Sequence, residues 1–221
     1  MPPVSWLTRW LKLPAADDPE DEWEPDYPED PELVAEHAAL MADLADAGQP
    51  VENMMELAPL DYRAQIPLLA RWLEQAQQLE MKTAILSLLR SHASAPEVVE
   101  ALLREYGRFE LDWVYRWQIA SVINDVNDPA IGERLLPLAI DPRQGRGAEM
   151  ALIALGRMKV AGALGPLIDR LDDPDLVGHA ADGLGRLGDP AALPALERAR
   201  PARDWERTEV ARAIRKLRRR A

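Results

Sequence analysis

The sequence predicts an all-α protein in which a pair of helices is repeated along the chain, and three observations support this fold class. Ala and Leu dominate the 221 residues, whereas Phe occurs once. From residue 33 onward, apolar residues recur at helical spacing without an alternating strand pattern. In the second half of the chain, a unit of about thirty residues repeats. With 48% hydrophobic and 29% charged residues, the chain has a globular composition and can bury a sizeable core.

The first 32 residues are expected to stand apart from the repeats. In residues 1–13, Trp6 and Trp10 lie on one apolar stripe of a short amphipathic helix, with cations on the other side. We expect this peptide to dock onto a protein groove, because so short a helix with two cations has only marginal affinity for lipid. Residues 14–32 contain ten acidic residues, five prolines and no base, which is typical of a disordered linker.

Helices follow one another from residue 33 to the end of the chain. Asp-Pro dipeptides mark helix starts, because the Asp side chain accepts hydrogen bonds from free amides and Pro needs no partner in the first turn. These dipeptides stand at 128–129, 141–142, 173–174 and 189–190. The second helix of successive units is expected to open with a proline-bearing motif, as in LLPL at 135–138. The expected helices are 33–47, 60–78, 81–92, 96–106, 111–126, 129–140, 146–158, 161–172, 175–187, 190–199 and 204–219.

The clearest repeat aligns residues 154–167 with residues 183–196 at a constant offset of 29. The matched pairs include Leu155 with Leu184, Gly156 with Gly185, Arg157 with Arg186, and Leu164 with Leu193. At an offset of 30 residues toward the C-terminus the same pattern recurs in the last expected helix, and at an offset of 31 residues toward the N-terminus it recurs in helix 111–126. One unit therefore recurs at least four times.

The segment ADGLGRLGDPAALPAL, residues 181–196, resembles the short HEAT-like repeats described in phycobilisome lyases and in bacterial HEAT-repeat proteins. Those units read A-x-x-A-L-G-x-[LI]-G-D-P-x-A-[VL]-P-x-L. The resemblance is strong over 145–200, fair over the rest of 111–219, and rests on helical periodicity alone over 33–110. It implies an α-solenoid of about five helix pairs over residues 33–221, with a concave surface. The basic helix 204–221 would cap the stack.

Composition and charge exclude several function classes. Cys is absent, so disulfides, thiolate catalysis and Cys-held metals are excluded, and three His residues supply a metal site poorly. The net charge of -12 argues against nucleic-acid binding, although the charge is uneven: residues 14–32 carry −10 and residues 198–221 carry +7. We expect a cytoplasmic protein with no cofactor, no metal, no nucleic-acid partner and no stable membrane association.

Two enzyme activities of HEAT-like proteins remain as alternatives. In an alkylpurine DNA glycosylase, Asp112, Trp113 and Trp117 would hold an extruded base. A bilin lyase is the second, although the residues that match here are those that pack helices in all such repeats. The His-Glu dipeptides that hold the di-iron centre of deoxyhypusine hydroxylase do not occur in the sequence. Since no residue set supplies a nucleophile with its base, a metal site or a phosphate loop, we expect no catalytic residue.

The predicted function is therefore a non-catalytic protein-binding scaffold or adaptor, with the concave surface and helix 111–126 as its main contact region. Trp113, Arg116 and Trp117 have the composition of an interface anchor, although as core they would replace smaller residues of later repeats. Arg157 and Arg186 recur one repeat apart, either as a basic stripe for an acidic partner or because helix C-termini favour cations.

Trp23 and Tyr27 lie among the carboxylates of the acidic linker. They form either a partner-binding motif that folds on contact or part of a solubilising tether.

The acidic composition also permits an immunity protein that inhibits a basic toxin, because complementary charge speeds association.

Overall fold

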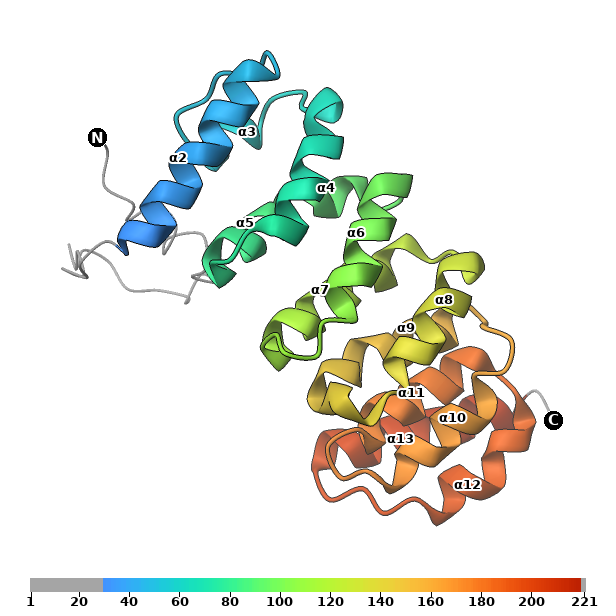
Figure 1. Cartoon of the computed structure of the whole chain (residues 1–221). Helices are drawn as coiled ribbons and strands as arrows, with labels where there is room; N and C mark the ends of the chain where they lie inside the picture. Colours follow the sequence, from blue (N-terminus) through green and yellow to red (C-terminus); the bar gives the residue numbers. More distant parts are fainter. Residues whose placement is uncertain (1–29, 220–221) are drawn as a thin grey trace, which may run out of the picture. The chain divides into compact units, whose positions relative to one another are not determined.

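The computed structural model describes residues 30–219, and all regular structure in this range is helical (Figure 1). The described part contains twelve α-helices and several short 3-10 helices, which confirms the all-α solenoid fold class. The predicted peptide 1–13, all but three residues of the linker 14–32, and both Trp23 and Tyr27 lie outside the described residues. The chain forms two compact units, Met1–His92 and Ala93–Ala221.

The described part of the N-terminal unit contains α2 (Pro31–Asp46), α3 (Met54–Leu57), α4 (Ile66–Gln75) and α5 (Leu79–Leu89). Helix α2 begins two residues earlier than predicted, because the Asp30 carboxylate accepts a hydrogen bond from the backbone N–H of Glu32 at 2.9 Å. Helix α3 was not predicted; the Asn53 side chain caps its start by accepting two backbone hydrogen bonds. Helix α5 packs against α4, and its buried Lys82 ammonium donates to the carbonyl of Leu73 near the end of α4.

The C-terminal unit contains eight α-helices between residues 93 and 219. They are α6 (Pro96–Tyr106), α7 (Trp113–Val126), α8 (Pro129–Ala139), α9 (Glu149–Arg157), α10 (Leu164–Asp169), α11 (Val177–Leu187), α12 (Leu193–Arg198) and α13 (Asp204–Arg218). Helices α7, α9, α11 and α13 pack one against the next, and we call them the first-helix row. Helices α8, α10 and α12 each pack against the row helix that follows in the sequence. Each helix is thus stabilised by sequence neighbours, as in a solenoid.

The first-helix row is packed so closely that backbones touch at glycines. A Cβ atom at Gly156 of α9 would lie 2.0 Å from the carbonyl oxygen of Gly183 in α11. A Cβ atom at Gly183 would in turn lie 2.5 Å from the carbonyl oxygen of Leu152. Gly156, which recurs in the sequence repeat, and Gly183 are therefore required by the spacing of α9 and α11, where no side chain fits. The recurring Gly185 lies instead against α13, where a Cβ atom would be 3.2 Å from Ala213.

The four Asp-Pro dipeptides were predicted to start helices, and three of them do. The carboxylates of Asp128, Asp141, Asp173 and Asp189 each accept a hydrogen bond from a backbone N–H two residues later, at 2.9 Å. Three of them begin a helix: α8 and the 3-10 helices Pro142–Ala148 and Pro190–Ala192. Asp173 begins a turn that leads into α11.

Three row helices end on a residue in the left-handed conformation. Asn127 after α7, Lys159 after α9 and Gly188 after α11 have φ angles of 56°, 57° and 81°. This conformation lets the chain turn away from the helix axis and is easiest for glycine.

The predicted place of the LLPL motif at a helix start is also wrong. Pro137 of the LLPL motif lies in the last turn of α8, whose first turn contains Pro129. Because Pro137 is exposed, the carbonyl group that loses its hydrogen bond there can be solvated. In α10 and α12, by contrast, Pro166 and Pro194 lie in the first turn, as predicted.

Candidate functional site

Three arginine–aromatic pairs lie near the N-terminal ends of α7 and α13, the first and last helices of the first-helix row. The guanidinium carbon of Arg143 lies 3.9 Å from the ring centre of Phe109, and that of Arg146 lies 4.1 Å from the ring centre of Trp113. The Arg203 guanidinium lies 5.4 Å from the Trp205 ring. With His179, these residues form what we call the aromatic edge: Phe109, Trp113, Arg143, Arg146, His179, Arg203 and Trp205. Cation–π contacts of this kind hold both partners in place on an accessible surface.

Trp205 is positioned by the preceding row helix. A Cβ atom at Gly178 of α11 would lie 2.2 Å from the Trp205 ring, so only glycine leaves room for the indole. The His179 ring lies 5.0 Å from the Trp205 ring, centre to centre. The Nε2 atom of His179 lies 3.7 Å from Oε2 of Glu149, and the other oxygen of that carboxylate accepts a hydrogen bond from Arg146 at 2.9 Å. Side chains from α9, α11 and α13 therefore form one continuous network.

Two titratable groups of this network are perturbed by burial. Burial lowers the pKa of His179, and the nearby Glu149 carboxylate opposes this effect. Burial alone would raise the pKa of Glu206, whose side chain is inaccessible. Hydrogen bonds from the backbone N–H groups of Arg203 and Ala202 and from the Arg203 guanidinium outweigh that effect, so the pKa of Glu206 lies below its ordinary value. Glu206 is thus a buried carboxylate that fixes the start of α13.

Exposed apolar surface of the C-terminal unit is concentrated at this same edge. Between residues 93 and 219, the exposed large hydrophobic side chains are Val114 and Trp205, at 42% and 40% exposure. Both lie in the first turn of a row helix, α7 and α13 respectively. The aromatic edge therefore combines exposed apolar groups with arginines, which is the composition of protein-binding surfaces.

The aromatic group predicted on helix 111–126 divides between surface and core. Trp113 is half-buried at the aromatic edge, and Trp117 is half-buried one turn later. Arg116 is only 5% exposed; its guanidinium donates to the carbonyls of Leu111 and Arg143 and to the Gln144 side chain. Arg116 is thus part of the core, and we leave it out of the contact surface. Asp112, considered for an enzyme, is exposed and accepts from the backbone N–H of Val114 at 2.7 Å as the cap of α7.

The two recurring arginines lie at helix C-termini and are engaged within the chain. Arg157 donates to the carbonyl of Asn124 in the last turn of α7 at 2.9 Å. Arg186 forms an ion pair with Asp182 at 2.9 Å on its own helix. These contacts favour the helix-terminus explanation for the two arginines over a basic stripe.

Sequence reasoning did not identify Arg146, Arg203 or Trp205. Trp205 lies 30 residues after Asp175, which lies 29 residues after Arg146, so the three residues occupy the same position in successive repeats. The repeat alignment could therefore have identified Trp205, because a tryptophan stands there where the two preceding repeats have charged residues. The arginines had no such signal, because their roles depend on the aromatic rings that they contact.

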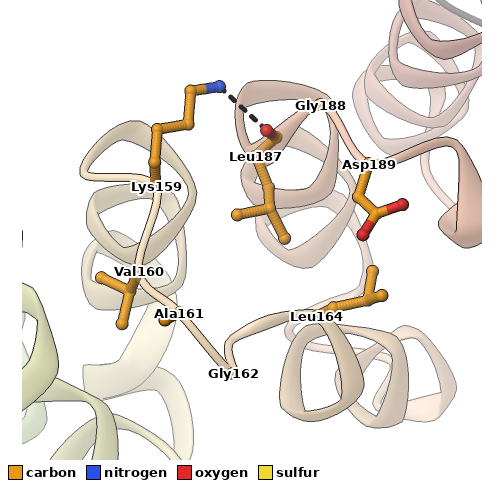
Figure 2. A pocket seen from close by; sticks show the side chains of 8 residues that line it. All are labelled: Lys159, Val160, Ala161, Gly162, Leu164, Leu187, Gly188 and Asp189. Carbon is orange, nitrogen blue, oxygen red and sulfur yellow. Dashed lines mark hydrogen bonds between the residues drawn. The ribbon is translucent and has the colours of Figure 1, made fainter.

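A hollow of about 450 Å³ lies at the C-terminal ends of α9 and α11 (Figure 2). Its lining contains one ammonium group and one carboxylate, and both are already used. Lys159 donates to the carbonyls of Leu187 and Arg186, and Asp189 accepts from the backbone N–H of Ala191. The charged groups of this hollow therefore stabilise helix ends, and we assign it no ligand.

Among residues 30–219, no three His, Asp or Glu side chains come together to hold a metal ion. No helix in that range is long and apolar enough to cross a membrane. A family model described as HEAT repeats matches residues 132–215, which span α9 to α12 entirely and parts of α8 and α13. Neither the search of curated proteins nor that of solved structures returns a match.

Proposed function

We propose that the HEAT-like repeats of residues 132–215 are the framework of a non-catalytic protein-binding module. HEAT repeats are commonly protein-interaction scaffolds. The observation that carries the proposal is the aromatic edge, whose three arginine–aromatic pairs accompany exposed Val114 in the first turn of α7 and exposed Trp205 in the first turn of α13. Trp and Arg are the residues that most often dominate binding energy at protein interfaces. A scaffold or adaptor is therefore the function that this surface supports best.

The aromatic edge is also held in place before any partner arrives. Arg146 is fixed by Glu149, and Arg203 by the buried Glu206. Trp205 is seated against Gly178. A preformed surface loses less side-chain entropy on association than a mobile one, so more of the contact energy is available for affinity.

The chemistry of the edge supports binding over catalysis. The carboxylates that contact its arginines, Glu149 and Glu206, are each engaged by one of them. His179 has no nucleophilic side chain among its contacts, which are with Glu149 and Trp205. The glycosylase alternative would need the Asp112 carboxylate, which caps α7. We therefore propose no reaction for this site.

The inhibitor alternative is supported in a different part of the chain. The C-terminal unit, residues 93–221, contains twenty basic and twenty acidic residues, whereas residues 1–92 contain six basic and eighteen acidic ones. The whole net charge of -12 thus belongs to the N-terminal unit. A basic partner, such as a toxin held by an immunity protein, would be attracted to residues 1–92 and not to the aromatic edge.

Site-specific photocrosslinking tests the proposed surface. A photoreactive benzoylphenylalanine at Val114 reports contacts at the aromatic edge, and the same group at the exposed Glu133 of α8 is the matched control. In cells that make the protein, we expect one discrete adduct with another protein at position 114 and none at position 133. The adduct should disappear when Trp205 is replaced by Ala. Adducts at position 133 alone, or an adduct at 114 that is unchanged in the Trp205→Ala variant, would refute the proposal.

A further inference from the structure

The cations of the C-terminal unit divide into two classes. Between residues 93 and 219, nearly every Lys or Arg side chain forms an ion pair or donates to a carbonyl or amide oxygen. The structure gives no such partner to four of them. These are Arg198, Arg215, Lys216 and Arg219, which we call the basic end. Arg198 ends α12, Arg215 and Lys216 lie in the last turn of α13, and Arg219 directly follows α13, so the unsatisfied charge is gathered at one end of the unit.

The two helices are joined at this place. Arg218 in the last turn of α13 forms an ion pair with Glu197 of α12 at 2.7 Å. Arg198 follows Glu197 directly, and Arg215 and Arg219 flank Arg218 on α13. Arg198, Arg215 and Arg219 are exposed, whereas Lys216 is half-buried beside a small groove between α11 and α13. The basic end is therefore an accessible surface across α12 and α13.

Helix-dipole stabilisation explains only part of this arrangement. Cations in the last turn of a helix gain about 0.3–1 kcal/mol each from the C-terminal dipole. Arg215 and Arg219, however, are four residues apart and therefore repel each other on one face of α13. Elsewhere in the unit, carboxylates relieve such repulsion, as Glu100 does for Arg104 and Arg134. Among the residues that the structure describes, no carboxylate forms an ion pair with a cation of the basic end.

We infer that the basic end is a second binding surface, whose partner is a short acidic segment of another protein. Neighbouring helices lie about 8–10 Å apart, so the four cations cover a length that three or four residues of extended peptide would match. Arginine side chains bind carboxylates with two parallel hydrogen bonds, which favours Asp and Glu as the residues recognised.

The same surface fits nucleic acid less well. A duplex or a long single strand needs a track of cations, because its affinity comes from many phosphate contacts. Here the cations are interleaved with the carboxylates of Glu197 and Glu209, which would face part of a longer polyanion.

Fluorescence anisotropy with the full-length protein tests this inference. The probe is a fluorescein-labelled polyglutamate peptide of ten residues, and a labelled single-stranded oligonucleotide is the competing probe. The test variant combines Arg215→Gln with Arg219→Gln. The matched control combines Arg104→Gln with Arg134→Gln, which removes the same charge from cations already paired with Glu100. We expect the peptide to bind at low salt, to weaken with added salt, and to bind the test variant roughly tenfold more weakly than the control.

Three outcomes would overturn the inference. They are absence of peptide binding, an equal loss of affinity in test and control variants, and tighter binding of the oligonucleotide through the same arginines. The test variant leaves Val114 and Trp205 in place, so crosslinking at position 114 should persist in it. A failure at the basic end is thereby distinguishable from a failure of the aromatic edge.

Discussion

Replacing Gly156 by Ala should separate the closest pair of helices in the first-helix row. The added Cβ would meet the Gly183 carbonyl oxygen at 2.0 Å, whereas ordinary contacts begin at 3.4 Å. The backbone of α11 would therefore have to retreat by about 1.4 Å. No rotamer change can relieve this clash, because both atoms are fixed to helical backbones.

The magnitude follows from two opposing effects. Overpacking a close-packed interior costs about 1–3 kcal/mol, and more when backbone must move. Ala is a better helix former than Gly by about 0.8–1 kcal/mol, which offsets part of that cost. We expect the Gly156→Ala variant to lose about 2 kcal/mol of unfolding free energy, with a fall in Tm of roughly 4–8 °C.

Calorimetry and urea titration followed by circular dichroism would measure this loss. Gly165→Ala in α10 is the control, because a Cβ atom there meets nothing within 4 Å. That variant should be neutral or more stable by about 0.5–1 kcal/mol. If Gly156→Ala were as stable as Gly165→Ala, the close approach of α9 and α11 would be refuted as the reason for glycine.

Three further predictions concern helix ends and buried polar groups. Gly188→Ala should destabilise the protein by about 1 kcal/mol, whereas Asn127→Gly should stabilise it by about 0.3 kcal/mol, because both positions have a positive φ that glycine adopts most easily. Urea titrations in which both variants change the unfolding free energy in the same direction would contradict this. Arg116→Met should cost about 3 kcal/mol, since it leaves the buried Gln144 side chain and two carbonyls without their donor; an unchanged urea midpoint would count against that network. Glu206→Gln should destabilise by about 1.5–3 kcal/mol at neutral pH. Because the pKa of Glu206 is lower in the folded state than its ordinary value of 4.5, the carboxylate's contribution is complete above that value and is lost as the pH falls below it. Urea titrations of both proteins across that range should show the gap narrowing with acid, and a constant gap would exclude the ionised form as the stabilising one.

Local features of the fold could be predicted from the sequence. Each Asp of the four Asp-Pro dipeptides bonds a backbone N–H only two residues later, and each left-handed turn at a helix C-terminus depends on one residue. The repeat of Gly156 at Gly185 likewise marked helices that approach closely. Such signals are readable because the interacting groups are near in sequence or recur with the repeat.

The candidate site was predictable only in part, because its contacts join distant residues. Trp113 was identified from composition, but Trp205 depends on the space above Gly178, on another helix. Arg116 was a candidate for partner binding, yet it is buried and donates to Gln144, 28 residues away. Neither relation has a local signature in the sequence.

The cross-repeat contacts of cations with carbonyls bear on folding cooperativity. Arg157 donates to a carbonyl of α7, Arg170 donates to Ile140 after α8, and Lys159 donates to Leu187 at the end of α11. Each repeat thus completes the hydrogen bonding of a neighbour's helix end. In a linear array, stability is the sum of each repeat's own folding energy and the coupling between neighbours. Contacts of this kind add to the coupling, so the repeats should unfold together, with a single sharp transition in place of successive fraying from one end.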